Sequence, residues 1–335
     1  MEKEIRQIRI LTVILAVLLC AVAAVMISLF PQYSASEETG ETKRFVYLAP
    51  LAEEDYWVDI ARGIKAADKD MGSDTLLMRF NEENGEFEMS IEDAINAEVD
   101  GIIMKSTEDI PDILEKLAED QIPVIFYDND YPDVKRTAYV GIDNYQAGIK
   151  AMEALINLME GKGKILITTR NIEAVSQSKR IEGCQDAAEQ FPEIEIAVLD
   201  HQTNELLYKE KLLNTLKSDP SINAILCLDG VSADITGDIL KDNRSEDKVT
   251  VAAFDLTDKT KQYLEEGIYS LVIMQDTYQI GYEAVKQLHA YWSGDYTDKE
   301  TEDTHCVFLD VICVMREDLE KYVREDDEEL EWNVY

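Results

Sequence analysis

Polar side chains stand at the ends of several apolar segments of this sequence. Asp128 follows Pro-Val-Ile-Phe-Tyr, Asp229 follows Ala-Ile-Leu-Cys-Leu, Asp255 follows Val-Ala-Ala-Phe, and Gln275 follows Leu-Val-Ile-Met. Carboxylates accept hydrogen bonds and an amide both donates and accepts, which suits the hydroxyl groups of a neutral, polyhydroxylated small solute. The aspartates could instead form turns or cap helices. We favour ligand contact, because ligands of open parallel sheets bind beyond the carboxyl ends of the strands.

An aromatic pair, Tyr56 and Trp57, stands where the first helix is predicted to begin. The C–H face of a sugar ring packs against an aromatic face, so Trp57 could stack on a ligand. The alternative is that Trp57 is the first buried residue of that helix. Adjacent residues project in different directions from one helix, so we expect that the two rings do not both face the core.

The elements that must position these residues are short β-branched or aromatic segments that alternate with longer amphipathic ones, a pattern typical of repeated βα units. Strands are predicted at residues 45–49, 75–80, 101–104, 123–127, 137–140, 164–168, 195–199, 224–228, 249–254, 269–274 and 307–314. Helices are predicted between the first four strands and at residues 145–159, 175–191, 206–218, 232–241, 259–266 and 278–292.

About ten such strands are too many for one small doubly wound sheet. The sequence therefore predicts an α/β fold of two doubly wound parallel-sheet lobes joined by a multi-strand hinge. The expected parts are a cytoplasmic end (1–9), a transmembrane anchor or signal segment (10–30), a linker (31–43), a first lobe (44–143 and 276–305), a second lobe (144–275 and 306–316) and a solvated acidic tail (317–335). The three crossovers of the hinge are expected near Asp143, Gln275 and Cys306.

The 335 residues carry a formal net charge of −37, with 69 Asp and Glu against 32 Lys and Arg. Phosphate backbones are held mainly by Lys and Arg, so this charge excludes nucleic acid as a partner. The chain is 46% hydrophobic, which is the composition of a folded protein and not of a disordered acidic tail.

Residues 10–30 form an uncharged apolar segment of a length that spans a bilayer. Lys3, Arg6 and Arg9 precede it, which places the N-terminus in the cytoplasm and the folded part outside the cell membrane. A cleaved signal peptide usually has a shorter apolar core, so we expect a retained anchor. Cleavage after Ala35 or Ser36 is the alternative, and it would leave a secreted or periplasmic protein.

Motifs at these strand ends resemble the type I periplasmic (solute-binding) protein family, in particular its sugar-binding group typified by ribose-binding proteins. The resemblance covers residues 45–314 and rests on six segments in the family's order. They are Glu54-Asp-Tyr-Trp57, Pro123-Val-Ile-Phe-Tyr-Asp128, Tyr139-Val-Gly-Ile-Asp-Asn144 with Ala147-Gly148, Ala224-Ile-Leu-Cys-Leu-Asp-Gly230, Val251-Ala-Ala-Phe-Asp255, and Met274-Gln-Asp276 with Gln279-Ile-Gly281.

Two positions depart from the family pattern. Ser178 stands where the family's Arg-x-Arg-x-x-Gly stretch has its first arginine, and Asn129 stands where many members place an arginine beside the aspartate. Both changes remove planar guanidinium groups that donate two hydrogen bonds at once, so neither ribose nor a common hexose is assumed as the ligand. Arg180 could be a donor in the pocket, but a structural ion pair is the expected role in so acidic a protein.

The resemblance implies a solute-binding protein that traps a sugar or sugar-like ligand between two lobes by hinge closure. The residues it implies as ligand contacts are Tyr56, Trp57, Asp128, Asn129, Asp143, Ser178, Arg180, Asp229, Asp255 and Gln275. It also implies an ABC permease as membrane partner, with a sensor kinase or chemoreceptor as the alternative. We expect a monomer. A domain that kept the fold and lost the pocket is a third possibility, which Ser178 and Asn129 favour.

No catalytic, metal-binding or cofactor-binding residues are predicted. The three histidines, His201, His289 and His305, share no metal-binding spacing, and the sequence has no Gly-x-Ser-x-Gly or His-Glu-x-x-His motif. An α/β enzyme that uses Asp128, Asp229 or Asp255 as general acid or base is the competing class. It would need an activated nucleophile or a cofactor loop, and the sequence shows neither.

Overall fold

The computed structural model describes residues 42–51, 55–81, 86–106, 111–130, 136–202, 204–242, 249–295 and 305–322, which belong to one compact unit. The predicted cytoplasmic end, the apolar segment 10–30, nearly all of the linker and residues 323–335 of the predicted tail lie outside the described residues. Within the described ranges, no helix combines the length and the apolar character needed to cross a membrane.

The first sheet has six parallel strands in the order β11-β5-β4-β3-β1-β2. They are β1 (Arg44–Pro50), β2 (Asp74–Phe80), β3 (Gly101–Lys105), β4 (Val124–Tyr127), β5 (Ala138–Ile142) and β11 (Cys306–Leu309). Strands β4 and β5 are buried along their whole length, as expected for parallel strands that helices cover on both faces.

The second sheet repeats this order as β12-β10-β9-β8-β6-β7. Its strands are β6 (Gly163–Thr169), β7 (Ile194–Asp200), β8 (Ile222–Cys227), β9 (Thr250–Phe254), β10 (Leu271–Met274) and β12 (Ile312–Val314). All pairs are parallel except that of β12 with β10, which is antiparallel.

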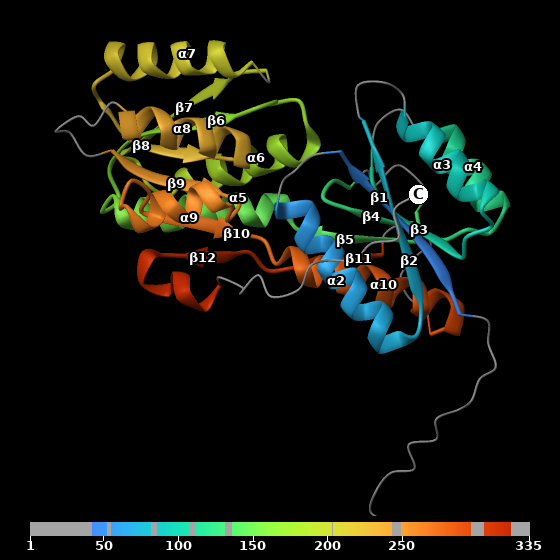
Figure 1. Cartoon of the computed structure of the whole chain (residues 1–335). Helices are drawn as coiled ribbons and strands as arrows, with labels where there is room; N and C mark the ends of the chain where they lie inside the picture. The colour runs from blue at the N-terminus through green and yellow to red at the C-terminus, as the bar shows by residue number, and fades with distance from the viewer. Residues whose placement is uncertain are drawn as a thin grey trace, which may run out of the picture. The chain divides into compact units, whose positions relative to one another are not determined.

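Helices cover both faces of each sheet (Figure 1). The first sheet carries α2 (Asp55–Met71) and α10 (Thr277–Ser293) on one face and α3 (Glu86–Asn96) and α4 (Pro111–Glu119) on the other. The second sheet carries α5 (Asn144–Leu158) and α6 (Val175–Ala188) on one face, and α7 (Glu205–Ser218), α8 (Gly230–Asp242) and α9 (Asp258–Glu265) on the other. We call these two assemblies the first and the second lobe. They confirm the predicted α/β fold of two parallel-sheet lobes.

Each lobe packs one pair of helices through glycine. An added Cβ at Gly281 of α10 would lie 2.0 Å from the carbonyl oxygen of Ile60 on α2, and one at Gly148 of α5 would lie 2.1 Å from that of Arg180 on α6. No real side chain tolerates such distances to backbone. Glycine at these two positions therefore lets each helix pair approach closely enough to close the core beneath it.

The chain passes between the sheets three times within the described residues. It passes from β5 to α5, from β10 to α10, and from β11 to β12. Asp143 caps α5 by accepting from the Gln146 amide, and Asp276 caps α10 by accepting from the Gln279 amide. Two crossovers thus enter a capped helix, and the third joins two strands.

The third crossover lies at residues 310–311, so the expectation that it falls near Cys306 is wrong. The segment predicted as one strand at residues 307–314 is two strands, and Cys306 pairs with Tyr139 in the first sheet. Residues 306–309 therefore belong with the first sheet and not with the second lobe, because β11 completes the backbone hydrogen bonding of β5.

The expected acidic tail is not wholly solvated. Residues Arg316–Lys321 form a 3₁₀ helix, η1, in which Leu319 is buried. Leu319 packs into the core of the second lobe with Val314 and Leu264. The many acidic residues of this segment led to the prediction of a fully solvated tail, although Leu319 packs into the core.

Candidate functional site

Two aspartates, Asp128 after β4 and Asp255 after β9, occupy corresponding positions in the two sheets. Both strands are fourth from the β2 or β7 edge of their sheet. Asp128 has φ 63° and Asp255 has φ 70°, the left-handed region that non-glycine residues rarely adopt. Backbone strain of this kind gathers at functional sites. We call these residues the paired aspartates.

In the first lobe, Asp128 accepts two hydrogen bonds from neighbouring side chains. The Tyr56 hydroxyl donates to its Oδ1 at 3.3 Å, and Asn129 Nδ2 donates to its Oδ2 at 2.8 Å. Tyr56 comes from the first turn of α2, so the start of α2 and the end of β4 meet here. The Oδ1 atom of Asn129 is buried and has no hydrogen-bond partner among the described residues.

In the second lobe, Asp255 accepts a hydrogen bond from Gln275 Nε2 at 2.8 Å. Burial raises the pKa of Asp255 above its ordinary value, and the charges of Asp128 and Asp229 raise it further. The Arg180 guanidinium and the Gln275 hydrogen bond act in the opposite direction without cancelling this rise. The pKa of the Tyr56 hydroxyl is also raised, first by burial and then by the charges of Asp128 and Asp255. This tyrosine of the first lobe therefore interacts electrostatically with both carboxylates.

Arg180 is 3% exposed, and neutral groups hold its side chain. Its Nε donates to Asn144 Oδ1 at 2.9 Å, its Nη1 donates to the Leu228 carbonyl, and its guanidinium carbon lies 4.2 Å from the centre of the Phe254 ring. No ion pair joins it to a described acidic residue, so the expected structural ion pair is not found in this part of the chain. Arg180 is structural in another way, because it ties α6 to α5 and β8.

The aromatic pair packs edge to face, with Tyr56 and Trp57 ring centres 4.7 Å apart at 79°. Both rings are partly buried against the core of the first lobe, so the expectation that they do not both face it is wrong. The reason is local: Trp57 meets Tyr127 of β4 edge-on at 5.9 Å, while Tyr56 reaches past the end of the same strand to Asp128. Trp57 Nε1 is buried and has no partner in the described ranges.

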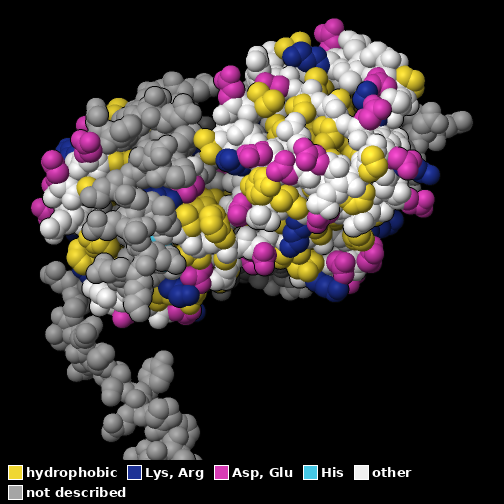
Figure 2. All heavy atoms as spheres, turned by 180° about the vertical axis from the view of Figure 1, so that it is seen from behind, with side chains coloured by type: hydrophobic (Ala, Val, Ile, Leu, Met, Phe, Trp, Pro, Cys, Tyr) yellow, Lys and Arg dark blue, Asp and Glu magenta, His cyan; other side chains and the backbone are white. Residues whose placement is uncertain are grey.

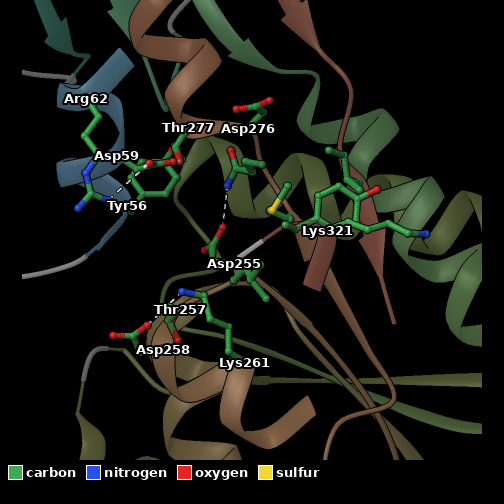
Figure 3. A pocket seen from close by; sticks show the side chains of 15 residues that line it. Tyr56, Asp59, Arg62, Asp255, Thr257, Asp258, Lys261, Asp276, Thr277 and Lys321 are labelled. Atoms are coloured by element: carbon green, nitrogen blue, oxygen red, sulfur yellow. Dashed lines mark hydrogen bonds and ion pairs between the residues drawn. The ribbon is translucent and has the colours of Figure 1, made fainter. Parts of the chain in front are cut away.

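A cavity of about 350 Å³ adjoins Asp255, one of the paired aspartates (Figure 3). Three predicted site residues, Tyr56, Asp255 and Gln275, lie in its wall, and the hydrogen bond from Gln275 to Asp255 lies within it. The rest of the wall comes from α2, the β9–α9 and β10–α10 connections, β12 and η1: Asp59, Arg62, Leu256, Thr257, Asp258, Lys261, Met274, Asp276, Thr277, Ile312, Lys321 and Tyr322. Asp128 and Arg180 are not in this wall. Tyr56 connects the cavity to Asp128, because it lines the cavity and also donates a hydrogen bond to Asp128.

Three other predicted site residues have contacts of their own. Asp143 caps α5. Asp229 accepts from the amides of Arg170 and Ser232 and from the Ser232 hydroxyl, each at 2.8 Å. Ser178 is exposed on α6, and its hydroxyl donates to the Val175 carbonyl. The structure thus brings Tyr56, Asp128, Asn129, Asp255 and Gln275 into one hydrogen-bonded and electrostatically coupled group, and it engages Asp143 and Asp229 in helix starts.

Sequence reasoning missed most of the cavity wall. Asp59 lies three residues after Tyr56 on the same helix, and its Oδ2 accepts from the Thr277 hydroxyl at 2.6 Å. The helical spacing from Tyr56 is a signal that could have identified it. Lys321 ends η1 and Tyr322 follows it, and nothing in the local sequence predicts that this segment lies beside the residues after β9.

Acidic side chains are not confined to this site. Figure 2 shows Asp and Glu scattered among basic and hydrophobic side chains on the face turned to the viewer. Many are compensated locally, as Asp219 is by Lys164 at 2.7 Å and Asp100 is by Lys43 at 2.7 Å. The net charge of the chain therefore says little about the charge of a ligand held by the paired aspartates.

Comparison with known proteins gives a family. A family model described as a periplasmic binding protein domain matches residues 45–295. Among solved structures, the glucose-galactose binding protein GanP of Geobacillus stearothermophilus is 28% identical, covers 84% of this chain and 99% of its own, and gives a TM-score of 0.75.

Two further solved structures share the fold at lower identity. The sugar-binding protein of a sugar ABC transporter from Bacillus halodurans is 21% identical, with 84% and 100% of the two chains covered and a TM-score of 0.78. A solute-binding protein of Burkholderia graminis, solved in complex with D-arabinose, is 22% identical, with 85% and 99% covered and a TM-score of 0.76. The matched family and these three neighbours are binding proteins and not enzymes. Since the family model spans both lobes, the chain belongs to the periplasmic binding protein domain family, as the motifs at its strand ends indicated.

Proposed function

We propose that this chain is an extracytoplasmic solute-binding protein that holds a sugar or sugar-like small solute between its two lobes. The observation that carries the proposal is the pair of left-handed aspartates, Asp128 and Asp255, one at the corresponding strand end of each lobe. A solute that donates hydrogen bonds to both would link the lobes. Because the described part of the chain passes between the sheets at three places, we infer that the lobes close about those crossovers when the solute binds.

The groups around the paired aspartates suit hydroxyl recognition. A carboxylate accepts from a hydroxyl, and Gln275 can donate and accept, so a polyol finds complementary partners on both lobes. The Tyr56 and Trp57 rings provide the apolar surface against which a sugar ring packs. These features support a sugar-like ligand without selecting one sugar.

We assign ligand contact to six of the ten residues predicted from the sequence: Tyr56, Trp57, Asp128, Asn129, Asp255 and Gln275. Asp143, Arg180 and Asp229 are assigned positioning roles, because their polar atoms already hold helix starts or carbonyl groups. Ser178 is assigned to the rim, since it is exposed and bonded only within its own helix.

Isothermal titration of the full chain in detergent tests the proposal. The panel is glucose, galactose, arabinose, allose, ribose and the corresponding amino sugars. We expect saturable binding of at least one member and a loss of about a hundredfold in affinity in Asp255→Asn, because a buried acceptor that faces the ligand becomes partly a donor. Glu182→Gln, an exposed residue of α6 that pairs with Lys179, is the matched control and keeps the affinity. Absence of binding across the panel contradicts the proposal.

We further propose that the apolar segment at residues 10–30 is retained as an anchor, with the folded part outside the membrane. The family match supports the extracytoplasmic position, and the length of the segment supports retention. The intact mass of the protein from its native membrane distinguishes this from cleavage after Ala35 or Ser36, which would shorten the chain by the leading residues.

The partner we propose is an ABC permease, with a sensor kinase or chemoreceptor as the second candidate. Uptake of the radiolabelled solute separates them. If the chain feeds a permease, cells that carry Asp255→Asn lose uptake. If the chain serves a sensor, uptake persists and the transcriptional or motile response to the solute is lost.

A further inference from the structure

The charge balance at the paired aspartates is negative, and this limits what can bind there. No ion pair joins Asp128 or Asp255 to a Lys or Arg in the described ranges. The cation that acts on both Asp255 and Tyr56 is Arg180. Asp128, Asp229 and Asp255 together place three carboxylates against this one guanidinium, and neutral donors hold Asp229. Negative charge is therefore in excess in this group.

Arg180 commits two of its five N–H donors to neutral partners within the second lobe. Its Nε and Nη1 already donate to Asn144 and to the Leu228 carbonyl, and the side chain is 3% exposed beneath the Phe254 ring. Its position is set by the packing of α5 on α6 through Gly148. The guanidinium therefore acts as a fixed charge at the base of the site and cannot turn to pair with either aspartate.

The cations in the cavity wall are matched by carboxylates of their own. Arg62 lies 3.9 Å from Asp59, and Lys261 lies 3.1 Å from Asp258. Lys321 pairs with Asp318, and its side chain runs away from Asp255 (Figure 3). None of these three contributes a surplus positive charge to the paired aspartates.

The uncharged groups at the site offer acceptors. Gln275 is 7% exposed, and its side chain lies in the cavity wall. Its Nε2 donates to Asp255, and no described donor reaches its Oε1. Ser178 and Asn129 add no positive charge. Acceptor oxygens from three side chains, two of them anionic, form a set that an ammonium group with three donors satisfies and that an anion does not.

Desolvation also favours a cationic ligand at this site. A buried carboxylate without a cation is costly, and a ligand that brings the cation removes that cost. The aromatic rings of Tyr56 and Trp57 attract a cation as well. A neutral sugar gains hydroxyl contacts from the same groups but leaves the excess negative charge uncompensated.

We propose that the site takes a sugar-like solute that carries a protonated amine, such as a hexosamine, in preference to the neutral or anionic sugar of the same skeleton. This inference rests on the proposed function and specifies the ligand class of that same site. The amine would lie against Asp128, Asp255 and Gln275 Oε1, and the ring would lie against the aromatic pair.

The test compares matched ligands on the full chain in detergent by isothermal titration: glucosamine, glucose, N-acetylglucosamine and glucuronate, with galactosamine and galactose as a second pair. We expect the amines to bind about tenfold more tightly than the neutral sugars, as one ion pair at intermediate dielectric permits. N-acetylglucosamine, which keeps the nitrogen without the charge, loses this advantage, and glucuronate does not bind. Added salt narrows the gap between amine and neutral sugar.

Two variants locate the effect. In Asp255→Asn and in Asp128→Asn the affinity ratio of amine to neutral sugar falls toward one, whereas Glu182→Gln keeps it. Either asparagine variant suffices if the other fails to fold, as judged by its melting curve. Equal or tighter binding of the neutral sugars by the unmodified chain overturns the inference and leaves the proposed function intact. Failure of every panel member to bind overturns both.

Discussion

The two lobes share one strand order, an aspartate at positive φ after the corresponding strand, and a helix pair packed through glycine, yet the side chains around the two aspartates differ. Each ends its fourth strand with an aspartate at positive φ, and each packs a helix pair through glycine. Around Asp128 the first lobe places tyrosine and tryptophan rings and an asparagine. Around Asp255 the second lobe places a glutamine and a buried arginine. The shared framework fixes where a ligand is held, and the side chains that differ decide what each lobe recognises.

The crossovers show a second difference. Asp143 and Asp276 cap the helices that enter the opposite lobe, so two crossovers are built alike. The third runs from β11, parallel to β5, to β12, antiparallel to β10. Two residues separate these strands, and the chain enters the second sheet in the sense opposite to that of its other strands. The repetition of the lobes therefore ends at this crossover.

Replacing the glycine of a helix pair should give the largest effect and should damage either lobe. We expect Gly148→Val and Gly281→Val each to lower the free energy of unfolding by about 3 kcal/mol or more, because the new side chain meets backbone carbonyls. Urea unfolding measures the change. Gly230→Ala, whose Cβ would meet its nearest neighbour at 3.6 Å, is the control. Tolerance of valine at Gly281 but not at Gly148 would show that the helix pairs are not equivalent.

Removing the guanidinium should affect the second lobe alone. We expect Arg180→Met to cost on the order of 3 kcal/mol, because the Leu228 carbonyl and Asn144 lose charged donors and become unsatisfied in a buried site. Hydrogen exchange should then rise in α5 and α6 and stay unchanged in α2 and α10. A uniform rise in both lobes would contradict the assignment of Arg180 to the packing of the second lobe.

The sequence predicts the fold of the backbone better than it predicts the contacts of the candidate site. The alternation of apolar strands and amphipathic helices predicted two lobes, and the strand ends predicted Asp128, Asp255 and Gln275 as neighbours of a ligand. Local sequence could not show that Asp229 satisfies its oxygens on Ser232, nor that Arg180 is held by a carbonyl, since both depend on the packing of distant elements. The boundary at β11 failed for the same reason: a strand's partner is not encoded in its own residues.

The buried carboxylate of the second lobe should carry a stability cost that is absent at low pH. The folded-state pKa of Asp255 is raised by burial, so stability is lost as the pH rises from the ordinary carboxyl pKa of about 3.9 through the raised value. We expect Asp255→Asn to raise the melting temperature of the ligand-free chain at pH 7 by roughly 2–4 °C and to have no such effect in acid. A lower melting temperature at pH 7 would argue against an uncompensated charge.

Two histidines allow a smaller test: His201 of the second lobe is buried, and His289 of the first lobe is partly buried. Burial lowers the pKa of His201, which contacts Ser232 at 2.9 Å in the second lobe, and that of His289, which meets Phe45 edge-on in the first. The unfolded chain binds protons more readily at both, so the stability they contribute is lost as the pH falls below the ordinary histidine pKa of about 6.5. His201→Gln and His289→Gln should each reduce the loss of melting temperature between pH 7 and pH 5. An unchanged profile in both variants would mean that neither ring stays neutral in the folded state.

The central claim is that one solute is held by both lobes at the paired aspartates. Hydrogen exchange of the full chain with and without saturating glucosamine, and with glucose as the second probe, tests it most directly. We expect new protection at the end of β4 around Asp128 and at the end of β9 around Asp255 in the same experiment, with the same dependence on ligand concentration. Protection confined to one of these strand ends, or found only elsewhere, would contradict it.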